Sequence, residues 1–291
     1  MKVLFIGKGE YVDYLSDMVF HGLHTLLGDE FYHSHPYGYM FSDFPKDPLR
    51  AMWGRGFTVY RLLDPATRNV PDDIPGRIAA HYFDRIIYGE FARCSDYIDL
   101  VLEHYPIGHV AFIDGEDHTD LHHPQLDMTQ FRFRPYFKRE LRNEHARPGV
   151  FPISFSIPAE RIVGEIPEKI QTLSPIIPGA SYSFNEEEPY YQQYRNAAFA
   201  MTWQKGGWDC LRHLEIMANA CVPVFKTINQ CPPLTMTSYP KGLFVEAIQV
   251  YNGYEAGSSA YRILLDRLMS HLWQYLTTEA LASYVMSILR R

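Results

Sequence analysis

Apolar residues occur along this chain in short blocks separated by polar, glycine- or proline-containing segments. The first block, Val3–Ile6, is closed by Gly7-Lys8-Gly9, a pattern typical of a buried parallel strand that ends in a tight turn. Apolar side chains then recur at helical spacing from Leu15 to Leu26. The sequence therefore predicts that the chain opens with a strand, a turn and a helix.

The same alternation continues toward the C-terminus. Apolar runs predict strands at residues 82–88, 110–113, 151–157, 197–202 and 221–225, with a further strand candidate at 243–245. Helical periodicity predicts helices at residues 187–196, 208–220 and 261–275, and a last helix that reaches Ile288. Residues 29–56 predict a long irregular segment. Alternating strands and helices indicate an α/β fold with mostly parallel sheets.

The length of 291 residues is sufficient for two domains of ordinary size. Residues 134–150 contain two prolines and several charges, and this composition predicts the crossing between domains. We therefore expect a Rossmann-like domain over residues 1–147 and a second over 148–291, with C-terminal helices. Two such parallel-sheet halves are expected to face each other across a cleft.

Residues 203–225 are the most informative stretch of the sequence. Within the predicted helix, Trp208, Arg212, Glu215 and Asn219 are spaced by four, three and four positions and are expected to share one face. Leu211, Leu214, Ala218 and Cys221 form an apolar stripe suited to packing on a sheet.

The start of this helix is flanked by Lys205, Gly206 and Gly207. Unpaired N–H groups and a partial positive charge at a helix start favour a phosphate there. Lys205 and Arg212 add full positive charges, and Glu215 is placed to accept hydrogen bonds from sugar hydroxyls. The arrangement suits a nucleoside diphosphate. A competing interpretation is a surface helix on which Arg212 and Glu215 form a solvated i,i+3 pair.

This segment resembles the donor-binding helix of the GT-B glycosyltransferases, of the exostosin-like or group 1-like kind. The matching residues have the form Lys-x-Gly-Trp-Asp-x-x-Arg-x-x-Glu-x-x-Ala-x-x-x-x-Pro, from Lys205 to Pro223. The resemblance covers residues 195–245 well and the rest only by architecture, and the chain is short for this family. It implies that Lys205, Arg212 and the glycine pair hold the diphosphate of a nucleotide sugar and that Glu215 holds the ribose. It also implies that no metal ion or other cofactor is needed.

A second cluster of chemically active side chains follows the strand predicted at 110–113. It comprises Asp114, Glu116, Asp117 and His118. Glycosyl transfer needs a group that takes the proton of the acceptor hydroxyl, and we expect Asp117 or Glu116 to be that base, with His118 next. Asp114 is expected to orient the turn through backbone N–H groups.

Two alternatives remain open for this cluster. Asp114 and Glu116 could bind Mg²⁺ or Mn²⁺, as the Asp-x-Asp of the GT-A glycosyltransferases does. The cluster could also be only an acidic turn with solvent-exposed histidines.

The two glycines Gly7 and Gly9 start an incomplete dinucleotide-binding motif, since its third glycine position is Val12. We therefore interpret them as a turn that approaches the acceptor.

Composition and charge limit the classes of acceptor and the cellular compartments that are expected for this protein. The net charge of −7 argues against broad binding to nucleic-acid backbones, although basic and aromatic residues alternate over 131–143 and permit a local patch. The four cysteines have no CxxC spacing, and no apolar run is long enough for a signal peptide or a membrane span. A cytoplasmic protein is expected.

The predicted function is metal-independent transfer of a hexosyl or pentosyl group from a nucleotide-diphosphate sugar to an acceptor hydroxyl. The acceptor is expected to be a glycan or another hydroxyl compound, and a modified nucleic acid is a second possibility. The alternative to an enzyme is a non-catalytic protein that binds a nucleotide or sugar phosphate.

Overall fold

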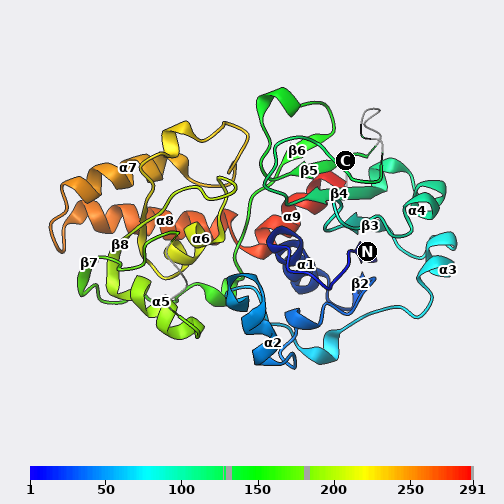
Figure 1. The fold of residues 1–291 in the computed structure, drawn as a ribbon, viewed down its shortest axis with the longest axis horizontal. Coiled ribbons are helices and arrows are strands. Elements are labelled where there is room, and N and C mark those ends of the chain that lie inside the picture. Colours follow the sequence, from blue (N-terminus) through cyan, green and yellow to red (C-terminus); the bar gives the residue numbers. More distant parts are fainter. Residues whose placement is uncertain (127, 129–132, 180–183, 290–291) are drawn as a thin grey trace.

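The protein consists of two parallel sheets covered by helices, which confirms the predicted α/β class (Figure 1). The computed structural model describes residues 1–126, 128, 133–179 and 184–289. The two sheets lie in separate halves of the molecule, and the described ends of the chain both lie in the half that contains the first sheet.

The first sheet has six strands in the order β2-β1-β3-β4-β5-β6, and all its pairings are parallel. Its strands are β1 (Val3–Ile6), β2 (Phe31–His33), β3 (Arg85–Tyr88), β4 (Val110–Asp114), β5 (Tyr136–Lys138) and β6 (Val150–Pro152). The chain enters at β1, moves to β2 on one side and returns to β3 on the other. The strand order therefore switches direction between β1 and β3, and a crevice forms at such a point.

Both faces of the first sheet are buried, which explains why its strands are continuous apolar runs. Val3 and Phe5 pack on the face covered by α1 (Tyr14–Leu27) and α9 (Thr278–Leu289). Leu4 and Ile6 pack on the opposite face, against α3 (Ile74–Ala79) and α4 (Ile98–His104). A further helix, α2 (Lys46–Ala51), lies in the segment between β2 and β3.

The second sheet contains three parallel strands, in the order β7 (Gln171–Leu173), β8 (Ala197–Met201) and β9 (Val222–Val224). The helices that follow its strands or precede them are α5 (Glu187–Asn196), α6 (Leu211–Ala218), α7 (Lys241–Asn252) and α8 (Ser259–Tyr275). Helix α9 then leaves this half and packs on α1 (Figure 1).

The chain crosses between the halves twice, at neighbouring points. Ile157 N donates to Leu276 O at 2.8 Å, and Thr278 N donates to Ile157 O at 3.0 Å. Gly22 on α1 lies so close to Thr278 that a Cβ there would overlap the backbone carbonyl. This close approach fixes α9 against the first half.

Several sequence predictions are corrected by these elements. Residues 136–138, assigned to a connector, form the buried strand β5, and the strand expected to open the second half is β6 at the edge of the first sheet. A proline just before a strand or in an edge strand does not prevent pairing, so residues 136–138 and 150–152 both belong to the first sheet. The sheets divide between β6 and β7, and the division at residue 147 stays a prediction.

Three smaller corrections concern helices. Residues 243–245 belong to α7 and are not a strand, the segment 29–56 contains β2 and α2, and the helix predicted at 208–220 spans only Leu211–Ala218. In the described part of the chain, no helix combines the length and apolar character that a bilayer crossing requires.

Candidate active site

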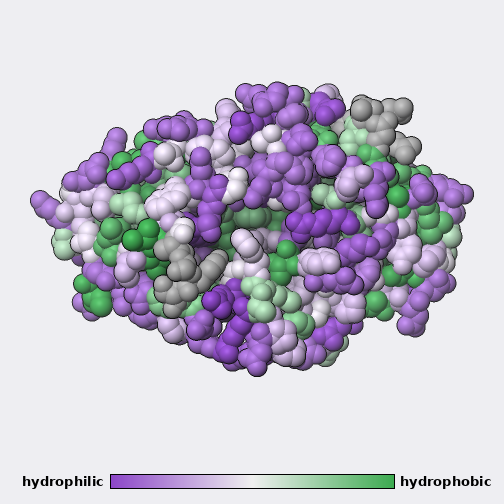
Figure 2. All heavy atoms as spheres, in the orientation of Figure 1, coloured by the Kyte–Doolittle hydropathy of each residue, from purple (hydrophilic) through white to green (hydrophobic). Residues whose placement is uncertain are grey.

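A pocket of 980 Å³ lies between the two halves and is lined by residues of both. From the first half come segments that follow each of its six strands, and from the second half come segments that follow β7 and β8. In the view of Figure 2, a hollow lies near the middle of the molecule, with hydrophobic residues at its floor. The pocket is the predicted cleft, and it is formed at the carboxyl ends of the strands, where open α/β sheets bind ligands.

Arg212 and Lys205 line the pocket on the side of the second half. Arg212 is partly buried, and its Nη1 is enclosed without a hydrogen-bond partner in the described structure. Lys205 is exposed and forms no ion pair with any described residue. A buried guanidinium nitrogen without an acceptor is costly, so the site is suited to an anion that would supply one.

Glu215 also lines the pocket, but it is buried and does not form the surface pair with Arg212 that the competing interpretation required. The Thr58 hydroxyl donates to its Oε1 at 2.6 Å, and the Tyr190 hydroxyl donates to its Oε2 at 2.7 Å. Burial raises the pKa of the Glu215 carboxyl above its ordinary value. Each carboxylate oxygen has a second lone pair, so a sugar hydroxyl can still bind there.

Thr58 belongs to the first half and is held by the second half through several contacts. Its N–H donates to the Glu187 carboxylate, its hydroxyl contacts Tyr191 as well as Glu215, and Arg161 Nε donates to its carbonyl at 2.8 Å. The segment around Thr58 thus completes the wall that contains Glu215. Sequence analysis missed this residue, because no local pattern relates it to a glutamate 157 positions away.

The glycine pair has a steric reason in addition to any ligand contact. A Cβ on Gly206 would overlap the Asp117 carboxylate, and a Cβ on Gly207 would overlap Glu140 and lie 2.8 Å from Arg139 Nη1. The absence of side chains therefore allows the loop before α6 to pack directly on the first half.

Trp208 does not share a helix face with Arg212, because α6 begins only at Leu211. Its ring stacks on Phe225, and its carbonyl oxygen lies 2.9 Å from His213 Nε2. Asn219 caps the C-terminal end of the helix and contacts Arg195. The four-residue stripe is thus reduced to Arg212 and Glu215 as residues that line the pocket.

The acidic residues after β4 are separated by the structure. Asp114 is fully buried, accepts from Tyr136 OH at 2.6 Å and Lys138 Nζ at 2.9 Å, and does not line the pocket. Its Oδ1 accepts from Glu116 N at 3.0 Å, which is the turn-orienting contact expected for it. The base assignment therefore cannot include Asp114, because its carboxylate is committed to a buried ion pair.

Glu116 and Asp117 do line the pocket, and each is paired with an arginine. Glu116 Oε1 lies 2.7 Å from Arg93 Nη2, and Asp117 pairs with Arg139 Nη2. His118 lies outside the pocket lining, with Nδ1 3.0 Å from Asp120 Oδ1. Asp114 and Glu116 thus direct their carboxylates at different cations, an arrangement that does not fit the proposed pair of metal ligands.

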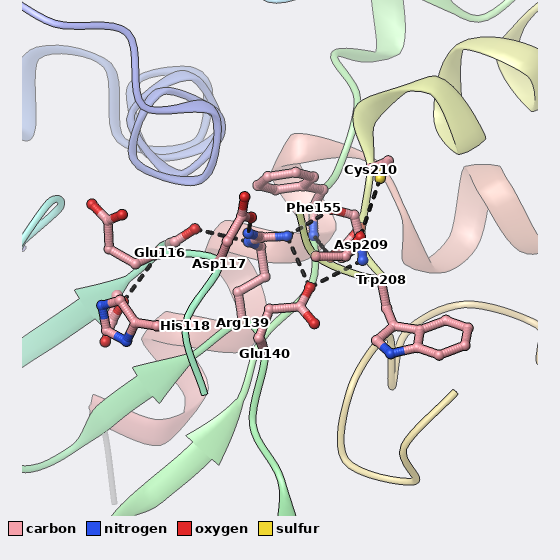
Figure 3. A network of polar contacts seen from close by, with 12 residues as sticks. Glu116, Asp117, His118, Arg139, Glu140, Phe155, Trp208, Asp209 and Cys210 are labelled. Atoms are coloured by element: carbon pink, nitrogen blue, oxygen red, sulfur yellow. Dashed lines mark hydrogen bonds and ion pairs between the residues drawn. The ribbon is translucent and has the colours of Figure 1, made fainter. Parts of the chain in front are cut away.

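A buried ionic network around Arg139 connects the segment after β4 to the second half (Figure 3). Arg139 donates from Nε to Gly115 O at 2.8 Å, and from Nη1 to Glu140 Oε1 at 2.9 Å and Asp209 O at 2.6 Å. The Asp209 carboxylate accepts from Phe155 N and Tyr239 OH, each at 2.7 Å. Burial raises the pKa of Asp209 to about 7, although Arg139 acts in the opposite direction.

Gly7 and Gly9 are not among the residues that line the pocket. Gly7 N donates to Ser34 Oγ at 3.2 Å, and Gly9 N donates to the buried Glu90 carboxylate at 3.3 Å. Their N–H groups serve the turn after β1, so the geometry gives no support to their assignment as acceptor-binding residues.

Asp13, which the sequence analysis did not single out, lies in the pocket at the start of α1. Its Oδ1 accepts from Ser16 N at 3.0 Å and thereby caps the helix. The signal available in the sequence was an aspartate directly before a helical pattern, which predicts a cap but not a pocket residue.

The basic segment 131–143 offers fewer free charges than its sequence suggests. Lys138 and Arg139 are buried and paired with carboxylates, whereas Phe131 and Arg132 lie outside the described residues. The local nucleic-acid patch stays a prediction.

No family model matches the chain, and no curated protein matches its sequence. One similar solved structure is an alpha-glucosyltransferase in complex with UDP-glucose and DNA containing an abasic site; it shares 10% identity over 99% of both chains, with a TM-score of 0.46. Similarity at this level does not establish a family, and the fold class above therefore rests on this chain's own strand order.

Proposed function

We propose that this protein is a glycosyltransferase of the GT-B kind that moves a sugar from a nucleotide-diphosphate sugar to an acceptor hydroxyl without a metal ion. The observation that supports this most directly is the state of Arg212. Its guanidinium lines an interdomain pocket and is partly enclosed, and among the described residues it forms no ion pair and its Nη1 has no acceptor. A diphosphate would supply that partner.

The donor is proposed to lie along the wall formed by the second half. Lys205 and Arg212 would bind the diphosphate, and the N–H groups at the start of α6 would add a partial positive charge. Glu215 would accept a hydroxyl of the ribose. An apolar surface on the same wall, formed by Ile176, Ile177 and Phe184, is suited to the flat face of a nucleobase.

In the transfer step, the acceptor oxygen bonds to the anomeric carbon while the bond from that carbon to the diphosphate oxygen breaks. The electron pair of the broken bond stays on the diphosphate. Lys205 and Arg212 would stabilise the negative charge that develops there, which is the role of a metal ion in other transferases. The acceptor would enter from the first half, and both a glycan and a nucleic acid stay open as its class.

The donor site is tested by thermal unfolding with UDP-glucose, UDP-N-acetylglucosamine, GDP-mannose, dTDP-glucose and pyrophosphate, each with and without Mn²⁺. A ligand at a hundred times its Kd adds about 2.7 kcal/mol of stability. We expect one nucleotide sugar to stabilise the protein equally with and without Mn²⁺. We expect Arg212→Ala to weaken its binding by about tenfold to a hundredfold, the cost of one charge-assisted hydrogen bond.

Arg262→Ala is the matched control, since Arg262 is an exposed arginine on α8 with no described ion pair. Absence of any stabilisation of the wild type would contradict the proposal. Stabilisation only with Mn²⁺ would contradict metal independence. Binding of a donor without release of nucleoside diphosphate, with sugars, DNA or water as acceptor, would favour the non-catalytic alternative.

A further inference from the structure

Asp13 lines the pocket from the turn after β1, whereas Glu116 and Asp117 line it from the segment after β4. It follows β1, and Arg93, which also lines the pocket, follows β3. These two strands are the ones between which the strand order switches direction. The crevice outside such a switch point is where open α/β sheets bind small molecules.

The bonding state of the carboxylates distinguishes Asp13 from its neighbours. Glu116 is paired with Arg93 and Asp117 with Arg139. Asp13 uses Oδ1 to cap α1, but its Oδ2 forms no hydrogen bond or ion pair with any residue that the structure describes. Within the pocket, Asp13 therefore keeps an acceptor oxygen that is not already committed to a cation.

Because Gly115 has no side chain, there is room beside it for the Asp13 carboxylate. A Cβ on Gly115 would lie 2.9 Å from Asp13 Oδ1 and 3.5 Å from Oδ2. The carboxylate is thus held from one side by the first turn of α1 and from the other by the backbone after β4, with its rotamer fixed by the bond to Ser16 N.

On the basis of the proposed function, we propose that Asp13 is the general base of the transfer reaction. Its Oδ2 takes the proton of the acceptor hydroxyl as the acceptor oxygen bonds to the anomeric carbon, and the diphosphate leaves with the electron pair of the broken bond. The proton then leaves Asp13 to water. Asp13 on the first half and Arg212 on the second half would thus act on the acceptor and on the leaving group respectively.

Charged groups around Asp13 are consistent with this role. Arg93 after β3, Glu116 after β4 and Arg139 after β5 act on Asp13, and, in addition to burial, Asp13 in turn raises the pKa of Asp17 on α1 and of Glu90 after β3. Burial above all raises the pKa of the Asp13 carboxyl from its ordinary value; Glu116 acts in the same direction, and the bond from Ser16 N, Arg93 and Arg139 act against it. A raised pKa makes a carboxylate a better proton acceptor near neutral pH.

The decisive variant is Asp13→Asn, because asparagine caps helices about as well as aspartate but cannot take a proton. The measurement is release of nucleoside diphosphate from the panel donor that stabilises the wild type, with water as acceptor. We expect turnover to fall about 10²- to 10⁴-fold, with donor-induced stabilisation unchanged. We expect Asp13→Glu to restore part of the activity, and the acidic limb of the pH–rate profile to disappear in Asp13→Asn.

Asp73→Asn is the matched control. Asp73 caps α3 through a bond from Gly76 N at 2.9 Å, and it does not line the pocket. Loss of stability in Asp13→Asn beyond that of the control would reveal a structural role, which the pH profile separates from a catalytic one.

The outcomes also separate this inference from the proposed function. If no panel donor stabilises the wild type, the proposed function fails. If a donor binds and Asp13→Asn turns it over as fast as the wild type, Asp13 is not the base and the function stands. A base of this kind acts in direct displacement, so a product of retained anomeric configuration would also overturn the assignment.

Discussion

Arg139 Nη1 donates to the backbone carbonyl oxygen of Asp209 at 2.6 Å, and this bond joins the carboxyl end of the first sheet to the loop before α6. The same guanidinium is buried, pairs with Asp117 and Glu140 and lies over the Phe155 ring at 4.6 Å. One side chain thus holds both walls of the pocket in register.

Arg139→Ala is expected to lower the free energy of unfolding by about 3–5 kcal/mol, because it leaves the buried Glu140 carboxylate without its cation. Urea unfolding monitored by circular dichroism measures this change. Arg267→Ala removes an exposed pair with Glu246 and is expected to cost less than about 1 kcal/mol. Equal losses in the two variants would show that the buried network does not stabilise the fold.

Gly207→Ala is expected to destabilise the protein by about 1–3 kcal/mol, because the added Cβ meets the buried side chains of Glu140 and Arg139. Gly206→Ala should cost less, since the atoms nearest to the Cβ there belong to the exposed side chain of Asp117, which can move aside. A Cβ added to Gly242 on α7 would meet no described atom within 4 Å, so Gly242→Ala provides the sterically neutral control. Thermal unfolding ranks the three variants, and a Gly206→Ala loss larger than that of Gly207→Ala would contradict the steric explanation.

Thr58→Val keeps the shape and β-branching of the side chain but removes the hydroxyl that donates to Glu215 Oε1. A buried carboxylate that loses a hydrogen bond is expected to cost about 1–3 kcal/mol of unfolding free energy. Donor binding should weaken as well, because Glu215 loses one of the two groups that orient it. Thr25→Val serves as control, since the Thr25 hydroxyl bonds only the His21 carbonyl within α1. Unchanged stability and donor affinity in Thr58→Val would show that Tyr190 alone positions Glu215.

The raised pKa of Asp209, about 7 in the folded protein, predicts a pH dependence of stability. An unfolded aspartate has a pKa of about 3.9, so between pH ~4 and 7 the folded protein keeps the proton and the unfolded chain releases it. Raising the pH through this window therefore favours unfolding by at most about 1.4 kcal/mol per unit. Asp209→Asn removes this contribution. We expect the difference in unfolding free energy between wild type and variant to fall from pH 4 to 7 and then to level off. A difference independent of pH would mean that Asp209 stays ionised beside Arg139.

Local sequence was sufficient for the elements whose periodicity is unbroken. The helix at 187–196 and the strand after it were predicted with nearly their observed bounds, because each element's pattern is complete within its own residues. Strand β5 was missed because its three residues are too few to show a period, and Pro135 before it indicated a break. Only pairing with β4 and β6 makes these residues a strand.

The residues of the site also fall into two groups: those that the local sequence identified and those that only the tertiary structure brought together. The sequence by itself determined that Lys205, Arg212 and Glu215 belong to one loop and helix after a buried strand, since their spacing is set by local geometry. Tertiary structure decided which other side chains reach them: Thr58 and Arg139 lie far away in the sequence, and contact depends on how two sheets pack. It also decided the state of each carboxylate. Charge pairing and burial arise only when strands from different parts of the chain meet. Asp114 is therefore buried and paired, while one oxygen of Asp13, which lines the pocket, has no partner among the residues that the structure describes.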